Sequence, residues 1–385
     1  MIIRDIAFEN FRNIASERVV FSEGTNVLCG PNAQGKSNIL EGIYLFARGR
    51  SFRGAHDHEM IRRGESAASL ALTFRRAGDR HDTVLEARMK SGERRKYFRG
   101  GAPLTGVREV IGNMRAVLFC PAHLELAGGG PAARRQFLDI ALSQLYPAYI
   151  DELTKYTRLV AHRNALLKEA ARRQVSRSEW ESFADMIALS GARIAVWRQG
   201  YVDRVGCAAE RVFSEMTGGA EVPHFRYISH YTKDAGEQIE AASHGAVSER
   251  AAAEIAGRVS PYYVDNIERE VKLGSTLYGI HRDDIAVTLD GMDVRDFASQ
   301  GQQRSVALSM KIAEGEISRE ETGEYPIFLL DDVLSELDST RRGYVLSAMA
   351  GKQIIITSCD ADVFGACSDA NIIQIRSGHV TGGET

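Results

Sequence analysis

Short apolar segments alternate with helical stripes along the first 125 residues. The spacing of Ile2, Ile6 and Phe8 predicts a strand over residues 1–9 in which these three side chains point inward. An apolar strand at 25–29 ends in a glycine-rich turn, and residues 38–47 then follow the helical period. Further strands are expected at 19–22, 69–74, 83–89 and 117–120, and the alternation within 69–74 and 83–89 is typical of an antiparallel sheet.

Between residues 131 and 217 the period is helical, which predicts two long helices that could pack as an antiparallel pair. A hairpin is expected at 221–231, helices at 262–272 and 305–317, and apolar strands at 285–289, 327–330 and 354–357. Short, fully apolar strands favour a parallel sheet covered on both faces. We therefore predict an α/β fold in which residues 1–125 and 273–385 build one domain, with residues 126–272 inserted as a mainly helical lobe.

Composition narrows the class of protein. Hydrophobic residues make up 44% of the chain, but no run of about 18 apolar residues exists, so no membrane span is expected. Charges at positions 4, 5 and 9 argue against a signal peptide. The five cysteines form no CxxC pair, which makes a disulfide framework or a zinc site improbable and fits a reducing cytoplasm.

The net charge of −3 hides an asymmetry between the two halves of the chain. Residues 1–217 carry 33 basic and 24 acidic side chains, a net charge of +9, whereas residues 218–385 carry 15 and 27, a net charge of −12. The charge therefore excludes only a uniformly basic protein. Arginine outnumbers lysine by 39 to 9. A GC-rich genome would explain this bias, although arginine also suits phosphate recognition.

A phosphate-binding loop follows the strand at 25–29. The segment Gly30, Pro31, Asn32, Ala33, Gln34, Gly35, Lys36, Ser37 matches G-x-x-x-x-G-K-[ST] between a predicted strand and a predicted helix that opens near Asn38. In such a loop the backbone N–H groups face phosphate oxygens, Lys36 would reach the β- and γ-phosphates, and the Ser37 hydroxyl would bind Mg²⁺. ATP and Mg²⁺ are therefore the expected cofactors.

Two carboxylates follow the apolar strand at 327–330, at the strand end where open α/β sheets bind ligands. Asp331 is predicted to hold Mg²⁺, and Asp332 to act as the base or water-positioning group for attack on the γ-phosphate. Upstream, Ser299, Gln300, Gly301 and Gln302 open a helix: Ser299 is a good N-cap, and Gly301 would let a phosphate approach. Alone, this segment is more typical of an ordinary capped helix.

Together these motifs resemble the ABC-type ATPases, and within them the RecF family of the SMC-related repair branch. The resemblance runs from end to end of the chain and rests on segments 8–13, 30–37, 49–53, 129–139, 279–284, 299–304 and 330–338. It implies that two subunits meet head to tail across two ATP molecules. Ser299, Gln300, Gly301 and Gln302 of one subunit would then contact the γ-phosphate held by Lys36 of the other, with Asp338 at the same interface and Arg12 near the nucleotide.

The chain departs from the family pattern at two places. Ala122 and His123 stand where RecF relatives usually carry an acidic pair, and Ile280 replaces the proline expected before His-Arg-Asp-Asp. In addition, Thr357 stands where transporter ATPases carry a histidine, as the resemblance leads us to expect. The shorter Asp332, in place of the transporter glutamate, fits a weak ATPase, and the resemblance implies that DNA stimulates it.

Three basic clusters lie in the first half of the chain, at residues 48–63, 88–99 and 151–177. Any one of them is more often a solvated face, but the family resemblance favours DNA contact for at least one, with Arg94, Arg95, Lys96 and Arg99 as candidates. Such phosphate contacts give salt-sensitive binding without base recognition.

The resulting hypothesis is an ATP-gated homodimeric clamp on DNA. By resemblance, it binds duplex DNA and junctions between single- and double-stranded DNA at gaps. It would help RecO and RecR load recombinase in replication and repair, support SOS induction, and work in the cytoplasm without a membrane partner. The main alternative is the ATPase subunit of a membrane transporter, which predicts a Q-loop and a switch histidine that the sequence does not display. A P-loop kinase would leave Ser299–Arg304 unexplained. A structural SMC-type scaffold would need heptad repeats over hundreds of residues.

Overall fold

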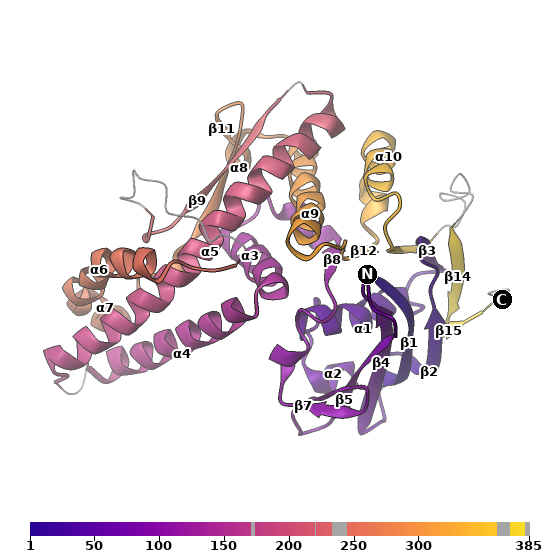
Figure 1. Cartoon of the computed structure of the whole chain (residues 1–385), viewed down its shortest axis with the longest axis horizontal. Helices are drawn as coiled ribbons and strands as arrows, with labels where there is room; N and C mark the ends of the chain where they lie inside the picture. Colours follow the sequence, from indigo (N-terminus) through magenta and orange to yellow (C-terminus); the bar gives the residue numbers. More distant parts are fainter. Residues whose placement is uncertain (171–173, 220, 233–244, 360–369, 382–385) are drawn as a thin grey trace. The chain divides into compact units, whose positions relative to one another are not determined.

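The computed structural model describes residues 1–170, 174–219, 221–232, 245–359 and 370–381. The chain forms two compact units, Met1–Glu125 with Ala307–Thr385, and Leu126–Val306. Each unit is described by itself below (Figure 1). In the described part of the chain, no helix is long and apolar enough to cross a membrane.

A six-stranded, mainly parallel sheet forms one half of the first unit. Its strands, in spatial order, are β15 (His379–Val380), β14 (Asn371–Arg376), β3 (Thr25–Cys29), β13 (Ile354–Ser358), β12 (Ile327–Asp331) and β8 (Ala116–Phe119). Only β15 is antiparallel to its neighbour. Because β3 lies between β13 and β14, both ends of the chain build one sheet, which confirms the predicted α/β architecture.

An antiparallel sheet forms the other half of the first unit. Its strands, in spatial order, are β2 (Ile14–Val20), β1 (Ile2–Phe11), β4 (Ala67–Arg75), β5 (Thr83–Lys90), β6 (Lys96–Arg99) and β7 (Ala102–Leu104). The structure corrects one inward position of the first strand, because Ile3 is fully buried and Ile2 is not. A register shift between Ile3 and Asp5 inverts the alternation there, while Ile6 and Phe8 point inward as predicted.

Helix α1 (Lys36–Arg48) contacts both sheets, through β8, β12 and β13 on one side and β4 on the other. A Cβ atom at Gly42 would lie 2.4 Å from the Phe8 ring, so glycine allows the close approach of helix to sheet. The unit also contains the helices α2 (Asp57–Met60) and α10 (Ser339–Ala348) and the 3₁₀ turns η1 (Val107–Glu109), η2 (Pro121–Glu125) and η4 (Val333–Glu336). Helix α9 (Gln300–Thr322) runs through the division between the units.

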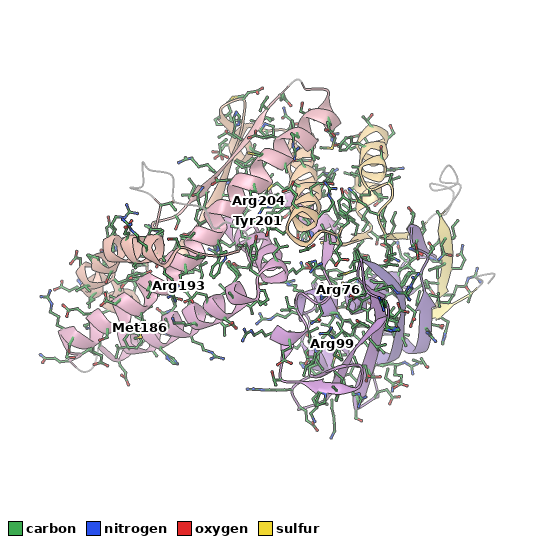
Figure 2. All side chains as sticks on the ribbon, in the orientation of Figure 1. Arg76, Arg99, Met186, Arg193, Tyr201 and Arg204 are labelled. Atoms are coloured by element: carbon green, nitrogen blue, oxygen red, sulfur yellow. The ribbon has the colours of Figure 1, made fainter. Side chains whose placement is uncertain are left out.

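The second unit is mainly helical. Its helices are α3 (Pro131–Leu145), α4 (Pro147–Ala170), α5 (Arg177–Thr217), α6 (Glu249–Asp265), α7 (Ile267–Leu273) and α8 (Val294–Phe297), with the 3₁₀ turn η3 (Ile280–Arg282). The described residues between 131 and 217 form three helices, not two, because the chain turns at Tyr146. On α5, Arg193 forms ion pairs with Glu152 of α4 (3.3 Å) and Glu249 of α6 (2.7 Å), so one side chain joins three helices (Figure 2).

A small antiparallel sheet in the second unit corrects two sequence predictions. Its order is β11 (Met292–Asp293), β10 (Asp284–Leu289) and β9 (Pro223–Ile228). The predicted hairpin at 221–231 is instead the single strand β9, which pairs with β10 about sixty residues later. This pairing also places residues 273–306 in the second unit, whereas the sequence assigned them to the ATPase domain. The sequence pattern of β9 did not predict its pairing with β10, because alternation indicates which face of a strand is buried but not which distant strand it pairs with.

Candidate nucleotide site

The phosphate loop connects β3 to α1 in the first unit. Gly30 and Gly35 have φ angles of 151° and 111°, and Ala33 also lies in the left-handed region with φ of 62°. A Cβ atom on Gly30 would lie 2.3 Å from the carbonyl oxygen of Ile375 on the neighbouring strand β14. The two glycines and Ala33 therefore wrap the backbone tightly, and such a concave backbone suits an anion at a helix N-terminus.

Lys36 lies at the base of this loop and is 4% exposed. Its Nζ donates to the carbonyl oxygens of Gly30 (2.6 Å) and Pro31 (2.9 Å). The Sγ of Cys359 lies 3.7 Å from the same ammonium and donates to Asn32 Oδ1 (2.8 Å). The lysine is thus held inside the loop, at the position from which it would meet phosphate oxygens.

Gln34 and Asn38 hold the loop to the rest of the first unit. Asn13 Nδ2 donates to the Gln34 carbonyl (3.2 Å), and Asn38 Nδ2 donates to Asn13 Oδ1 (2.7 Å). The Gln34 carbonyl also accepts from the backbone N–H of Gly378 (2.8 Å), and its Oε1 accepts from that of Ser377 (2.6 Å). Asn13 was not singled out from the sequence, although it closes the segment 8–13 that carries the family resemblance.

The carboxylate of Asp331 lies beside Ser37 at the end of β12. Burial raises the pKa of Asp331, and hydrogen bonds from Ser37 and from Thr357, 3.0 Å away, oppose the rise. A serine hydroxyl and a carboxylate are oxygen donors of the kind Mg²⁺ prefers, so this pair fits the expected ion. The described residues contain no cluster of three or more His, Cys, Asp or Glu side chains that could hold a metal ion.

Thr357, at the end of β13, connects the two adjacent carboxylates. Its hydroxyl accepts a hydrogen bond from the backbone N–H of Asp332 (2.9 Å) and lies 3.4 Å from the carboxylate of Asp332. Asp332 itself has a φ angle of 52°, so the chain turns sharply directly after β12. Sequence reasoning noted Thr357 only as a replacement for a histidine and missed this contact.

Arg12 forms an ion pair with Glu41 of α1, the helix that follows the phosphate loop. Its guanidinium donates to both carboxylate oxygens of Glu41 (2.7 and 2.9 Å) and to the carbonyl of Glu59 (2.9 Å). Glu41 lies on α1, is fully buried and also accepts from the Ser51 hydroxyl. Arg12 therefore neutralises a buried acid next to the site. Arg53, outside the predicted site, donates to Asn38 Oδ1 (2.9 Å), and its charge partly opposes the rise that burial causes in the pKa of Asp331.

Asp338 is the N-cap of α10. Its carboxylate accepts from the backbone N–H of Arg341 (2.9 Å) and pairs with the Arg341 side chain, and these hydrogen bonds lower its pKa. His123 Nδ1 donates to the Leu118 carbonyl (2.9 Å). Burial lowers the pKa of His123 to about 3, so the ring is neutral at physiological pH.

The segment Ser299–Gln302 forms a reciprocal cap at the start of α9. Ser299 Oγ accepts from the Gln302 backbone N–H (3.2 Å), and Gln302 Oε1 accepts from the Ser299 backbone N–H (2.7 Å). The Gln302 amide group also donates to Glu221. Ser299 and Gln300 are exposed, and Gly301 is half-buried. The capping predicted for Ser299 is confirmed, and the roles of this segment toward a second subunit stay predictions.

The segments 129–139 and 279–284, which had no role assigned from their spacing, meet in the core of the second unit. Arg134 forms a bidentate pair with Asp284 (2.6 and 3.0 Å). Arg198 on α5 pairs with Asp139 (2.8 Å) and with the buried Asp283 (3.0 Å). Its guanidinium also donates to the carbonyl of Ile280 (2.7 Å), whose apolar side chain is buried. The charged motif residues therefore hold the second unit together.

The four DNA-contact candidates differ in their surroundings. Arg95 is mostly buried, pairs with Asp57 and donates to Tyr97 Oη (2.9 Å) and the Gly49 carbonyl (3.2 Å), so its charge is already used inside the first unit. Lys96 pairs with Glu93 at 3.3 Å. Arg94 and Arg99 form no ion pair with any residue that the structure describes, and both are exposed. The sequence could not separate these side chains, because charge alone does not reveal which cations already have partners.

Comparison with known proteins decides the family. The family described as RecF/RecN/SMC N terminal domain matches residues 2–381. A DNA replication and repair protein RecF from Geobacillus kaustophilus is 34% identical over 385 residues, covering 99% of each chain. One from Alkaliphilus oremlandii is 32% identical over 358 residues, covering 93% of each. The chain belongs to the RecF family.

Solved structures agree with this membership. One described as the recombination mediator protein RecF-ATPrS in the RecFOR pathway has a TM-score of 0.87 and 31% identity, and covers 98% of this chain and 97% of its own. The Smc head domain from Pyrococcus furiosus, at 16% identity and a TM-score of 0.54, covers 99% and 95% and shows only the shared fold. RecF membership confirms an ABC/SMC-type ATPase and argues against the transporter alternative.

Proposed function

We propose that this RecF family member is an ATP-gated clamp on DNA in recombinational repair and replication. The observation that carries the proposal is the half-site in the first unit, where the phosphate loop, the Ser37–Asp331 pair and Thr357 come together. Gly30–Ser37 and Asn38 would hold ATP, with Lys36 and Asp332 acting in hydrolysis. Ser37 and Asp331 would bind Mg²⁺, which supplies charge neutralisation at the phosphates.

A contact to the γ-phosphate from the side opposite the phosphate loop would complete this half-site. In the proposed dimer, Ser299, Gln300, Gly301 and Gln302 of the second subunit supply it, with Asp338 at the same interface. The exposure of Ser299 and Gln300 at the start of α9 supports this assignment, because helix N-termini attract anions. Arg12 supports the site through Glu41. Hydrolysis would remove these γ-phosphate contacts and open the clamp.

The DNA contacts are assigned to the exposed cations of the β5–β6 region. Arg94 and Arg99 are the favoured DNA contacts, and Lys96 makes a smaller contribution because it pairs with Glu93. Arg95 is not a DNA contact in this proposal, because Asp57 neutralises its charge. Such contacts favour salt-sensitive binding to duplex DNA and to single-strand junctions at gaps. Because the relatives are replication and repair proteins and a structural neighbour is placed in the RecFOR pathway, RecO and RecR are the proposed partners. Support of SOS induction and a cytoplasmic location go with this role.

The test is the molar mass of the purified chain with and without ATP and Mg²⁺. Wild type should double in mass with ATP, whereas Lys36→Ala and Ser299→Arg should stay monomeric. The matched control is Ser178→Arg, which places the same charge on an exposed serine near the start of α5 and should dimerise normally. Asp332→Asn should keep the ATP dimer and lose hydrolysis. A Ser299→Arg variant that dimerises like wild type would refute the composite site.

A further inference from the structure

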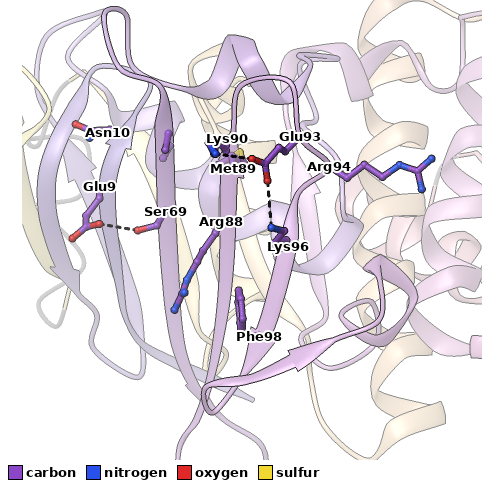
Figure 3. Close-up of a pocket in the computed structure, with 12 residues that line it drawn as sticks. Glu9, Asn10, Ser69, Arg88, Met89, Lys90, Glu93, Arg94, Lys96 and Phe98 are labelled. Atoms are coloured by element: carbon purple, nitrogen blue, oxygen red, sulfur yellow. Dashed lines mark hydrogen bonds and ion pairs between the residues drawn. The ribbon is translucent and has the colours of Figure 1, made fainter.

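A groove crosses the solvent face of the antiparallel sheet in the first unit, over β1, β4, β5 and β6 (Figure 3). It arises because the outward side chains of β4 are small, with Ala67, Ser69 and Ala71 between buried neighbours. The adjacent strand β5 instead projects Arg88 and Lys90. Long side chains beside a row of small ones leave a space of about 460 Å³.

Strand register orders the groove from one acidic edge to a basic edge. Glu9 of β1 lies opposite Ser69 of β4, Ser69 opposite Arg88 of β5, and Arg88 opposite Lys96 of β6. One row therefore runs from a carboxylate through a hydroxyl to two cations. From β1 to β5 is two strand spacings, about 10 Å, which is the width of a single extended chain.

The base of the basic edge is aromatic. The guanidinium of Arg88 lies 4.2 Å from the centroid of the Phe98 ring and also pairs with Glu86 at 2.7 Å. This contact covers the ring face, so Phe98 offers no open platform for stacking a nucleobase. Single-stranded nucleic acids depend on such platforms for much of their affinity. The groove is therefore poorly suited to stacking the bases of a single strand, and its charge favours an anionic chain that binds through ion pairs.

The protein's own Glu93 indicates which anion the groove recognises. Glu93 lies at the turn between β5 and β6, and its two carboxylate oxygens lie 2.7 Å from Lys90 Nζ and 3.3 Å from Lys96 Nζ. Hydrogen bonds from Lys90 and then from Lys96 lower the pKa of Glu93, so it stays ionised. Figure 3 shows this carboxylate between the two lysines, with Arg94 directed away from them.

We propose that this groove docks an extended acidic peptide segment of a partner protein, whose carboxylates replace Glu93 between Lys90 and Lys96. Further acidic side chains would meet Arg88, and apolar side chains would lie over the small residues of β4. Glu93 then acts as an internal competitor, because the partner must displace it. The site is separate from the phosphate loop, but it shares Lys96 with the DNA contacts proposed above, so the peptide and DNA would compete for this side chain.

The experiment measures fluorescence anisotropy of a labelled acidic octapeptide, made of Asp and Glu with two Phe, against the full chain without ATP. Glu93→Gln should bind this peptide about fivefold more tightly than wild type, because two ion pairs no longer compete. Arg88→Glu should bind it at least tenfold more weakly. The matched controls are Glu254→Gln and Arg250→Glu, which make the same charge changes in an exposed ion pair on α6 and should leave affinity unchanged.

Three outcomes would overturn the proposal. In the first, Glu93→Gln leaves the affinity for the peptide unchanged. In the second, the same peptide with Gln in place of its acidic residues binds equally well. In the third, a single-stranded oligonucleotide displaces the peptide and is itself weakened more strongly by Arg88→Glu, which would assign the groove to nucleic acid. Lys36→Ala should bind the peptide like wild type, so a failed ATP dimer and a failed peptide site are separate results.

Discussion

Replacing Arg198 by methionine tests whether the buried charge network holds the second unit together. The substitution keeps a long apolar stem but removes a guanidinium that pairs with Asp139 and Asp283 and donates to Ile280 and Tyr149. Asp283 is fully buried, so the variant would contain an uncompensated carboxylate in the core. Breaking a buried pair in this way costs about 3–5 kcal/mol.

That loss corresponds to a fall in Tm of about 10 °C, at roughly 2–4 °C per kcal/mol for a unit of this size. The chain offers a specific probe, because its two tryptophans, Trp180 and Trp197, both lie buried on α5. Thermal and urea unfolding followed by tryptophan fluorescence therefore reports the second unit. The matched control is Arg193→Met on the same helix, whose partly exposed ion pairs should cost no more than about 1 kcal/mol.

The pH dependence of stability provides a second test of the Arg198–Asp283 pair. Burial raises the pKa of Asp283 in the folded state, and Arg198 is the main group that lowers it, so the variant should raise it further. A carboxyl group with a raised folded pKa keeps a proton that the unfolded chain has lost, so stability falls as pH rises through this window. Arg198→Met should thus regain stability on acidification from about pH 7.5 to about pH 5, and added Asp283→Asn should remove that dependence.

Three results would refute this reasoning. The first is a loss of unfolding free energy below about 1 kcal/mol for Arg198→Met, and the second is a loss that stays the same at acidic pH. The third is a double variant, Arg198→Met with Asp283→Asn, that is no more stable than Arg198→Met alone.

Three further predictions concern the first unit. Thr357→Val removes the hydroxyl that holds Asp331, so ATP hydrolysis should fall about tenfold or more while ATP affinity changes little. Turnover and equilibrium binding measure the two effects, and an equal loss of both would contradict this role. Arg95→Met should lower stability and leave salt-dependent DNA binding intact, whereas Arg99→Met should leave stability intact and weaken salt-dependent DNA binding. Thermal melting and salt titration of DNA binding measure the two effects. Because the pKa of His123 lies at about 3, stability should fall as pH drops from about 6.5 toward 3. His123→Gln should remove this part of the pH dependence, and an NMR titration of the ring near pH 6.5 would contradict it.

Local chemistry made much of the first unit predictable from the sequence. The phosphate loop needs glycines at Gly30 and Gly35 because the backbone there adopts positive φ angles, and a strand before the loop and a helix after it are read from hydrophobic periodicity. The buried strand before Asp331 was equally visible, because four apolar residues precede two acids. These signals are short in sequence and each reports its own conformation.

Long-range pairing was not predictable in the same way. Residues 273–306 join the second unit because β10 pairs with β9, and nothing in either strand specifies that partner. The same limit applies to charge. Arg12, Arg95 and Arg99 look alike in the sequence, yet Glu41 and Asp57 neutralise the first two.

The sequence by itself therefore determined the kind of site, because the motifs predicted to bind phosphate and magnesium are local and depend on residue type and spacing. Only the tertiary structure decided which polar side chains are engaged. Asn13, in the turn between β1 and β2, contacts the loop, and Thr357, on β13, contacts Asp331, because the fold brings these separate segments together. Hydrogen bonds and ion pairs act over a few ångströms in space, whatever the separation along the chain.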